Sequence, residues 1–75
     1  MAREQTVRIL AEMVANVIVV EVAVDDQVEP GDTLCLLESM KMEIPVLTET
    51  AGVLTKIAVK EGDVVQEHDL IAVVE

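Results

Sequence analysis

One lysine stands between two methionines in the stretch Glu38-Ser39-Met40-Lys41-Met42-Glu43. A lysine amine becomes a nucleophile once it is deprotonated, although its ordinary pKa is about 10.4. Apolar runs lie on both sides, so the stretch predicts a strand, a tight turn and a second strand with Lys41 at the apex. A hairpin with an ordinary solvated lysine fits the same spacing. Exposed methionines at an apex and the scarcity of lysine favour a special role.

The other residue types that could perform chemistry are poorly placed for it. Cys35 is the only cysteine and lies in an apolar run, which is typical of a buried, inert thiol in a reducing compartment. His68 is the only histidine, so a zinc site has no ligand set and a solvated turn histidine is the better interpretation. Asp32 and Asp69 could in principle pair as catalytic carboxylates, but a short chain offers little cavity for them. We therefore expect no catalytic and no metal-ligating residues.

Composition sets the class of protein. The chain has 75 residues, which is enough for one domain over residues 1–75. It is 52% hydrophobic with no aromatic residue, so the core must be aliphatic, and a stacking platform for single-stranded nucleic acid is excluded. The net charge of −10 argues against any nucleic-acid partner and favours a soluble monomer. Neither a membrane span nor, at Met1–Glu4, a signal peptide is expected, so we predict a cytoplasmic protein.

Short apolar runs separated by turn residues predict an all-β fold. No stretch has a clear helical period, and Pro45 indicates an edge strand or a bulge. Alternation in the run from Val53 to Val59 places Val53 and Ile57 on one face and Leu54 on the other. The region from Asp25 to Asp32 is interpreted as a turn. The predicted strands cover residues 6–10, 17–24, 33–38, 43–48, 53–59 and 70–74.

The chain also repeats itself with a shift of 37 residues, which lays Ala15–Glu38 over Gly52–Glu75. Two similar halves predict two interlocked antiparallel sheets in a flattened barrel-sandwich with pseudo-two-fold symmetry. Lys41 follows the first half and the C-terminus follows the second, so Lys41 should lie on an exposed tip far from both termini. The identical pairs are Val22/Val59, Asp26/Asp63, Val28/Val65, Asp32/Asp69 and Glu38/Glu75.

The stretch Glu38-Ser39-Met40-Lys41-Met42 resembles the attachment motif of biotinyl domains of the biotin carboxyl carrier type. The turn around Gly62-Asp63, the glycine at Gly52 and the duplicated halves resemble the same family over most of the chain. Related lipoyl domains usually place an acid before the lysine and a small residue after it, so Met40 and Met42 favour biotin. The sequence departs from the family at turns, with Asp25 opposite Gly62 and His68 opposite Gly31. The motif itself is intact, although Ser39 stands where alanine is common.

The resemblance implies a carrier protein with no catalysis of its own. Lys41 would receive biotin in amide linkage from a biotin protein ligase and ferry carboxyl groups between biotin carboxylase and carboxyltransferase sites. Glu38, Met40 and Met42 would be recognised by the ligase and the partners, although strand packing remains open for one methionine and ordinary solvation for the acids. Two alternatives remain: a lipoyl carrier of the 2-oxo acid dehydrogenase type, and an unmodified β-module that binds a protein.

Overall fold

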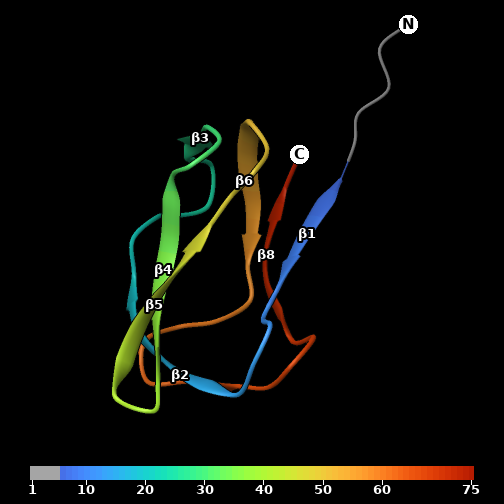
Figure 1. Cartoon of the computed structure of the whole chain (residues 1–75). Coiled ribbons are helices and arrows are strands. Elements are labelled where there is room, and N and C mark those ends of the chain that lie inside the picture. The colour runs from blue at the N-terminus through green and yellow to red at the C-terminus, as the bar shows by residue number, and fades with distance from the viewer. Residues whose placement is uncertain (1–5) are drawn as a thin grey trace, which may run out of the picture.

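The computed structural model describes residues 6–75, and in this range the chain forms eight strands and no helix (Figure 1). No helix long and apolar enough to cross a membrane therefore occurs between residues 6 and 75. The expectation about a signal peptide at Met1–Glu4 falls outside this range. The strands are β1 (Val7–Leu10), β2 (Ala15–Val20), β3 (Gln27–Val28), β4 (Thr33–Ser39), β5 (Met42–Leu47), β6 (Gly52–Ile57), β7 (Val64–Val65) and β8 (Leu70–Val74).

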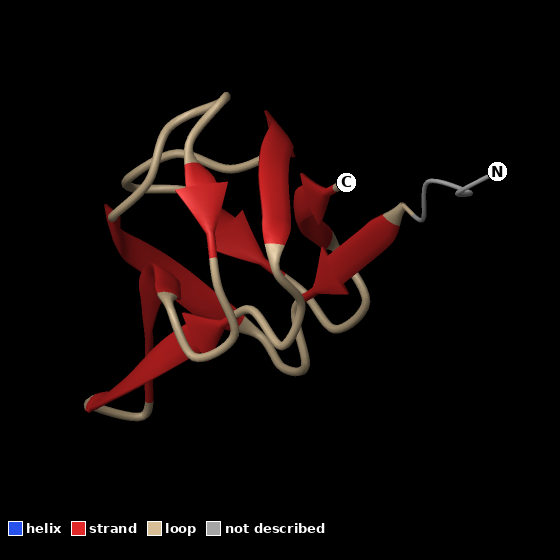
Figure 2. Ribbon diagram, turned by 90° about the horizontal axis from the view of Figure 1, so that it is seen from above, coloured by secondary structure: helices blue, strands red, loops and turns tan. Residues whose placement is uncertain are grey.

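Two four-stranded sheets contain all eight strands. Their orders are β1-β8-β6-β3 and β5-β4-β2-β7, and every pairing is antiparallel. The chain passes repeatedly from one sheet to the other, so each sheet contains strands from both halves of the sequence (Figure 2). The predicted all-β class with two antiparallel sheets is confirmed. Pro45 lies in β5, at the edge of its sheet, where a missing N–H leaves no ladder bond unmade.

An aliphatic core lies between the sheets. Leu34, Leu37, Leu54 and Ile71 are almost completely buried, and the rest of the core is valine, alanine and Cys35. Burying one such side chain contributes about 1.5–3 kcal/mol, so a chain without aromatics still gathers a sufficient hydrophobic term. Within residues 6–75, every buried side-chain polar atom has a hydrogen-bond partner. The core therefore needs neither aromatics nor a buried charge.

The pseudo-two-fold repeat is visible in the turns. A shift of 37 residues carries β2 onto β6 and β3 onto β7, and β4 onto β8. Asp26 accepts the Ala23 N–H at 2.8 Å, and its equivalent Asp63 accepts the Lys60 N–H at 3.0 Å. These aspartates therefore stabilise the corresponding turns in both halves.

Three details of the sequence interpretation were wrong. The strand predicted over residues 17–24 starts and ends earlier, because β2 is Ala15–Val20. The stretch from Asp25 to Asp32 is not turn alone, because it contains β3, and its equivalent in the second half contains β7. The simple alternation in β6 also fails: Leu54 is fully buried, whereas Val53 is 39% exposed. The pairing of β6 with β8 shifts register between Leu54 and Lys56, and such a bulge moves the following residues to the other face. Alternation counted through the bulge therefore assigns the wrong inward residues.

His68 has a left-handed backbone with φ 77°, whereas its equivalent Gly31 has φ 93°. A residue with a Cβ is disfavoured in this backbone region by about 1–2 kcal/mol. Glycine avoids this cost, but it loses about 0.5–1 kcal/mol more in conformational entropy when the chain folds. We expect His68→Gly to raise the free energy of unfolding by about 0.5 kcal/mol, measured by urea denaturation followed by circular dichroism. Gly31→Ala is the matched control, and it should lose about 1 kcal/mol, since nothing lies within 4 Å of its new Cβ. Equal effects of both variants would contradict a conformational cause.

Cys35 is 1% exposed, and burial raises the pKa of its thiol. The folded thiol therefore keeps its proton to a higher pH than the unfolded thiol. Above the ordinary thiol pKa of about 8.5, the unfolded state binds fewer protons and the free energy of unfolding falls as pH rises. We expect Cys35→Ala to lack this fall between pH 8 and 10 in urea titrations. We also expect thiol reagents to label Cys35 only in denaturant, and rapid labelling of the folded protein would contradict this burial.

Candidate functional site

Lys41 lies in a two-residue turn between β4 and β5. Ser39 pairs with Met42 at the end of the two strands, so Met40 and Lys41 are the only loop residues. Both have positive φ, 54° for Met40 and 66° for Lys41. Two positive φ values are the requirement of a type I′ turn, whose twist matches that of the flanking strands. The predicted hairpin with Lys41 at its apex is present.

This turn is built from residues that the conformation disfavours. Asparagine and glycine are the usual residues of a type I′ turn, whereas a side chain with a Cβ costs about 1–2 kcal/mol in the left-handed region. Met40 and Lys41 both adopt this disfavoured conformation. Backbone strain of this kind persists only where the surrounding structure fixes it, and it clusters at functional sites.

The remainder of the hairpin fixes the turn. β4 lies inside its sheet between β5 and β2, and it places Leu34, Cys35 and Leu37 in the core. β5 pairs with β4 along six positions from Thr33↔Leu47 to Ser39↔Met42. The tip therefore projects from a buried strand, and it presents Lys41 at a repeatable position.

The residues predicted to be recognised by partners surround the tip. Met40 is 91% exposed and Met42 is 64% exposed, so neither side chain is packed in the core. Glu38 and Glu43 lie directly opposite each other, and both are exposed. Like charges directly across a ladder are destabilising, and at this place they also give the tip an acidic rim.

The tip points away from the chain ends. In both views the β4–β5 hairpin lies at the opposite end of the domain from the start of β1 and the end of β8 (Figures 1 and 2). The geometric prediction from the repeat is therefore confirmed for the described residues.

The other candidates do not form a site. Asp32 accepts the Glu29 N–H at 2.9 Å and Asp69 accepts the Gln66 N–H at 2.8 Å, so each carboxylate is used in its own turn. His68 is exposed, and its Nε2 lies 3.9 Å from the neighbouring Glu67 carboxylate. Residues 6–75 hold no group of three potential metal ligands. Among residues 6–75, the exposed amine of Lys41 therefore remains as the candidate for covalent modification.

Comparison with known proteins places this geometry in a family. The chain belongs to the biotin/lipoyl family, because the family model described as "Biotin-requiring enzyme" matches residues 7–74. It is 58% identical over 64 residues to "Biotinylated protein TB7.3 homolog" of Mycobacterium leprae, which covers 85% of this chain and 90% of the relative. The biotinyl/lipoyl fold predicted from the sequence is thereby confirmed.

Solved structures agree on the fold. The Kluyveromyces lactis urea carboxylase matches all of this chain with a TM-score of 0.88 and 32% identity, although the match is only 7% of that enzyme's length. The lipoyl domain of the 2-oxoglutarate dehydrogenase complex from Azotobacter vinelandii has a TM-score of 0.74 over 89% of this chain and 95% of that domain. At 21% identity the second match shows a shared fold alone.

Proposed function

We propose that this protein is a biotin carboxyl carrier in which Lys41 holds biotin in amide linkage. The observation that carries the proposal is a lysine at the apex of a strained two-residue turn, between two exposed methionines, in a chain of the biotin/lipoyl family. The relative named as a biotinylated protein supports the same cofactor. The site fits the group chemically, because an exposed primary amine is the group that an activated carboxylic acid acylates.

Attachment needs a biotin protein ligase. Lys41 loses a proton to a base of the ligase, and its Nζ then attacks the acyl carbon of the activated biotin while the activating group leaves. The positive charge at Lys41 disappears when the amide forms. The turn contributes position, because the strained backbone and the buried β4 strand hold Nζ outside the body of the domain.

Bound biotin supplies the nitrogen that accepts and releases a carboxyl group. The domain supplies orientation and reach, and a tether keeps the group at high effective concentration near successive sites. We propose biotin carboxylase and carboxyltransferase components as partners. The exposed Met40 and Met42 suit this work, since soft thioethers adapt to more than one binding surface. The domain itself is proposed to be a non-catalytic monomer of the cytoplasm, where Cys35 stays reduced.

The lipoyl alternative uses the same fold and the same lysine. Met40 before the lysine and Met42 after it favour biotin, because lipoyl domains usually have an acid and a small residue at these positions. The M. leprae relative at 58% identity favours biotin as well, whereas the likeness to a lipoyl domain is one of fold.

Intact mass of the protein purified from its native host tests the proposal. We expect the mass of the chain plus one amide-linked biotin, together with a positive streptavidin blot. A lipoyl increment would replace the proposal with its alternative. An unmodified mass at every growth stage would favour a β-module that only binds protein.

A further inference from the structure

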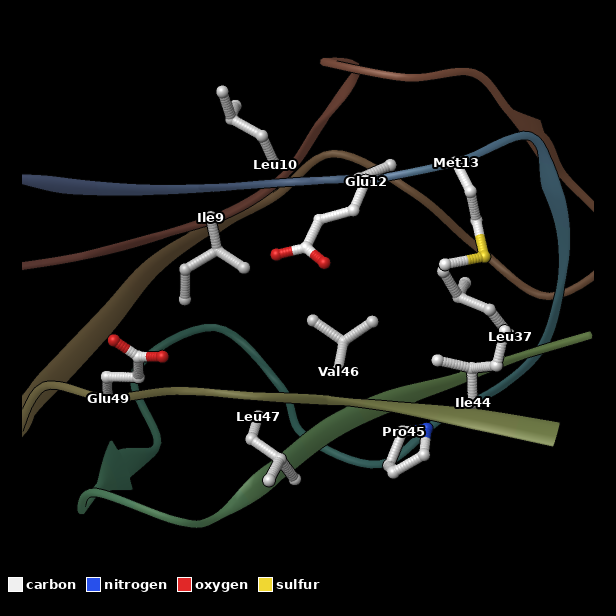
Figure 3. A pocket seen from close by; sticks show the side chains of 11 residues that line it. Ile9, Leu10, Glu12, Met13, Leu37, Ile44, Pro45, Val46, Leu47 and Glu49 are labelled. Carbon is white, nitrogen blue, oxygen red and sulfur yellow. The ribbon is translucent and has the colours of Figure 1, made fainter.

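A groove separates the edge strands β1 and β5. Its volume is about 220 Å³, and it begins at Ile44, three residues beyond Lys41. Figure 3 shows Ile9 and Val46 pointing into the space between the two strands. The carboxylates of Glu12 and Glu49 point into the same space. The groove is thus lined by both aliphatic side chains and two carboxylates.

The groove follows the internal repeat. A shift of 37 residues carries β1 onto residues 44–47 of β5, so the two walls are equivalent segments of the two halves. The repeat of Ala15–Glu38 in Gly52–Glu75 does not include β1, so this pair of walls extends the equivalence of the two halves. The equivalent pairs that line the groove are Ile9/Val46, Leu10/Leu47 and Glu12/Glu49.

The apolar lining is only partly covered by the domain itself. Leu10 is 41% exposed and Leu47 is 46% exposed at the two rims, while Ile9 and Val46 are half-buried. β1 pairs only with β8, and β5 pairs only with β4, so each wall is a sheet edge. An apolar side chain placed in the groove would remove this surface from water, and that burial would stabilise the complex.

The charges at the groove are negative in sum. Glu12 and Glu49 are both exposed, and neither forms an ion pair with another residue between 6 and 75. A neighbouring hollow is lined by these two acids and by Arg8, so its lining carries one cation and two carboxylates. A basic side chain entering from outside would meet favourable electrostatics, because complementary charge steers and orients association.

We infer that this groove docks a partner-protein segment that presents an apolar side chain next to a lysine or arginine. The apolar side chain lies against Ile9, Ile44 and Val46, and the cation lies between Glu12 and Glu49. Three residues of strand span about 10 Å, so the docked segment sits beside the tip that carries Lys41. The groove then orients a partner toward the tip without using the tip itself.

Synthetic peptides test the inference on the unmodified protein, so the result does not depend on biotin. The probe is acetyl-Gly-Leu-Arg-Leu-Arg-Gly-amide, and the readout is the NMR shift of the methyl groups of Ile9, Ile44 and Val46. We expect saturable shifts with a Kd below about 1 mM. Peptides with serine in place of leucine, or glutamate in place of arginine, should bind at least about tenfold more weakly.

Variants locate the cation. Glu12→Gln with Glu49→Gln should weaken binding about tenfold, whereas Glu29→Gln with Glu67→Gln, at exposed sites away from the groove, should change it less than about twofold. Equal weakening by both pairs, or shifts without saturation, would show diffuse attraction to an acidic chain and overturn the inference. Occupation of the groove by biotin on Lys41, or by a second copy, would overturn it too. In the first case, biotinylation without peptide would shift the NMR signals of these methyl groups. In the second case, dilution of the protein would sharpen the same signals.

Discussion

Lys41→Arg should abolish biotin attachment completely, while Lys56→Arg and Lys60→Arg should keep it at the wild-type rate. Arginine preserves the positive charge and most of the length of the side chain. Its guanidinium stays protonated, since the pKa exceeds about 12, so it offers no nucleophilic nitrogen. Lys56 lies within β6 and Lys60 in the following turn, so neither stands at the apex of a two-residue hairpin.

The measurement is incubation of each variant with a biotin protein ligase, ATP and biotin, followed by intact mass and streptavidin blot. Lys41 is exposed, so its replacement should leave the Tm unchanged, and an unchanged Tm excludes unfolding as the cause of lost labelling. Streptavidin labelling of Lys41→Arg at the wild-type rate would show that another lysine is the acceptor. Loss of labelling in Lys56→Arg as well would point to recognition of overall charge.

The site could be predicted from local sequence because its determinants are local. Ser39 to Met42 is a strand end, two loop residues and a strand start, and no distant contact is needed to make Lys41 the apex. The positive φ values of Met40 and Lys41 could not be predicted, because both residue types disfavour that region. The flanking strands impose it through their twist and register.

The fold could be predicted wherever a strand is long enough to show a pattern of apolar residues. Apolar runs and the 37-residue repeat indicated two sheets and placed the tip opposite the termini. The two-residue strands β3 and β7 have no periodicity to detect, since Val28 and Val65 are single buried residues between turns. The groove between β1 and β5 could not be predicted for a different reason. Its walls are 37 residues apart, and only the assembled sheets bring them together.

Gly52→Ala should lower the free energy of unfolding by about 3 kcal/mol. Gly52 has φ 159°, and a Cβ there would lie 2.5 Å from the Glu75 carbonyl oxygen and 2.9 Å from Val74 Cγ1. The adjacent backbone cannot withdraw easily, because the Val53 N–H donates to that same oxygen at 2.8 Å and the Glu75 N–H donates to the Val53 carbonyl at 2.9 Å. Overpacking against fixed backbone costs about 1–3 kcal/mol, and loss of this pairing adds to it.

The internal repeat supplies the control for this prediction. Ala15 occupies the equivalent position in the first half, where its Cβ is buried in the core, so Ala15→Gly should cost only about 1 kcal/mol. In thermal unfolding followed by circular dichroism, we expect the Tm of Gly52→Ala to fall by at least about 12 °C and that of Ala15→Gly by about 4–8 °C. Similar losses at both positions would mean that the contact with Glu75 yields. If the larger loss is found, Gly52 is required where the chain end closes on β6, at the end of the domain away from Lys41.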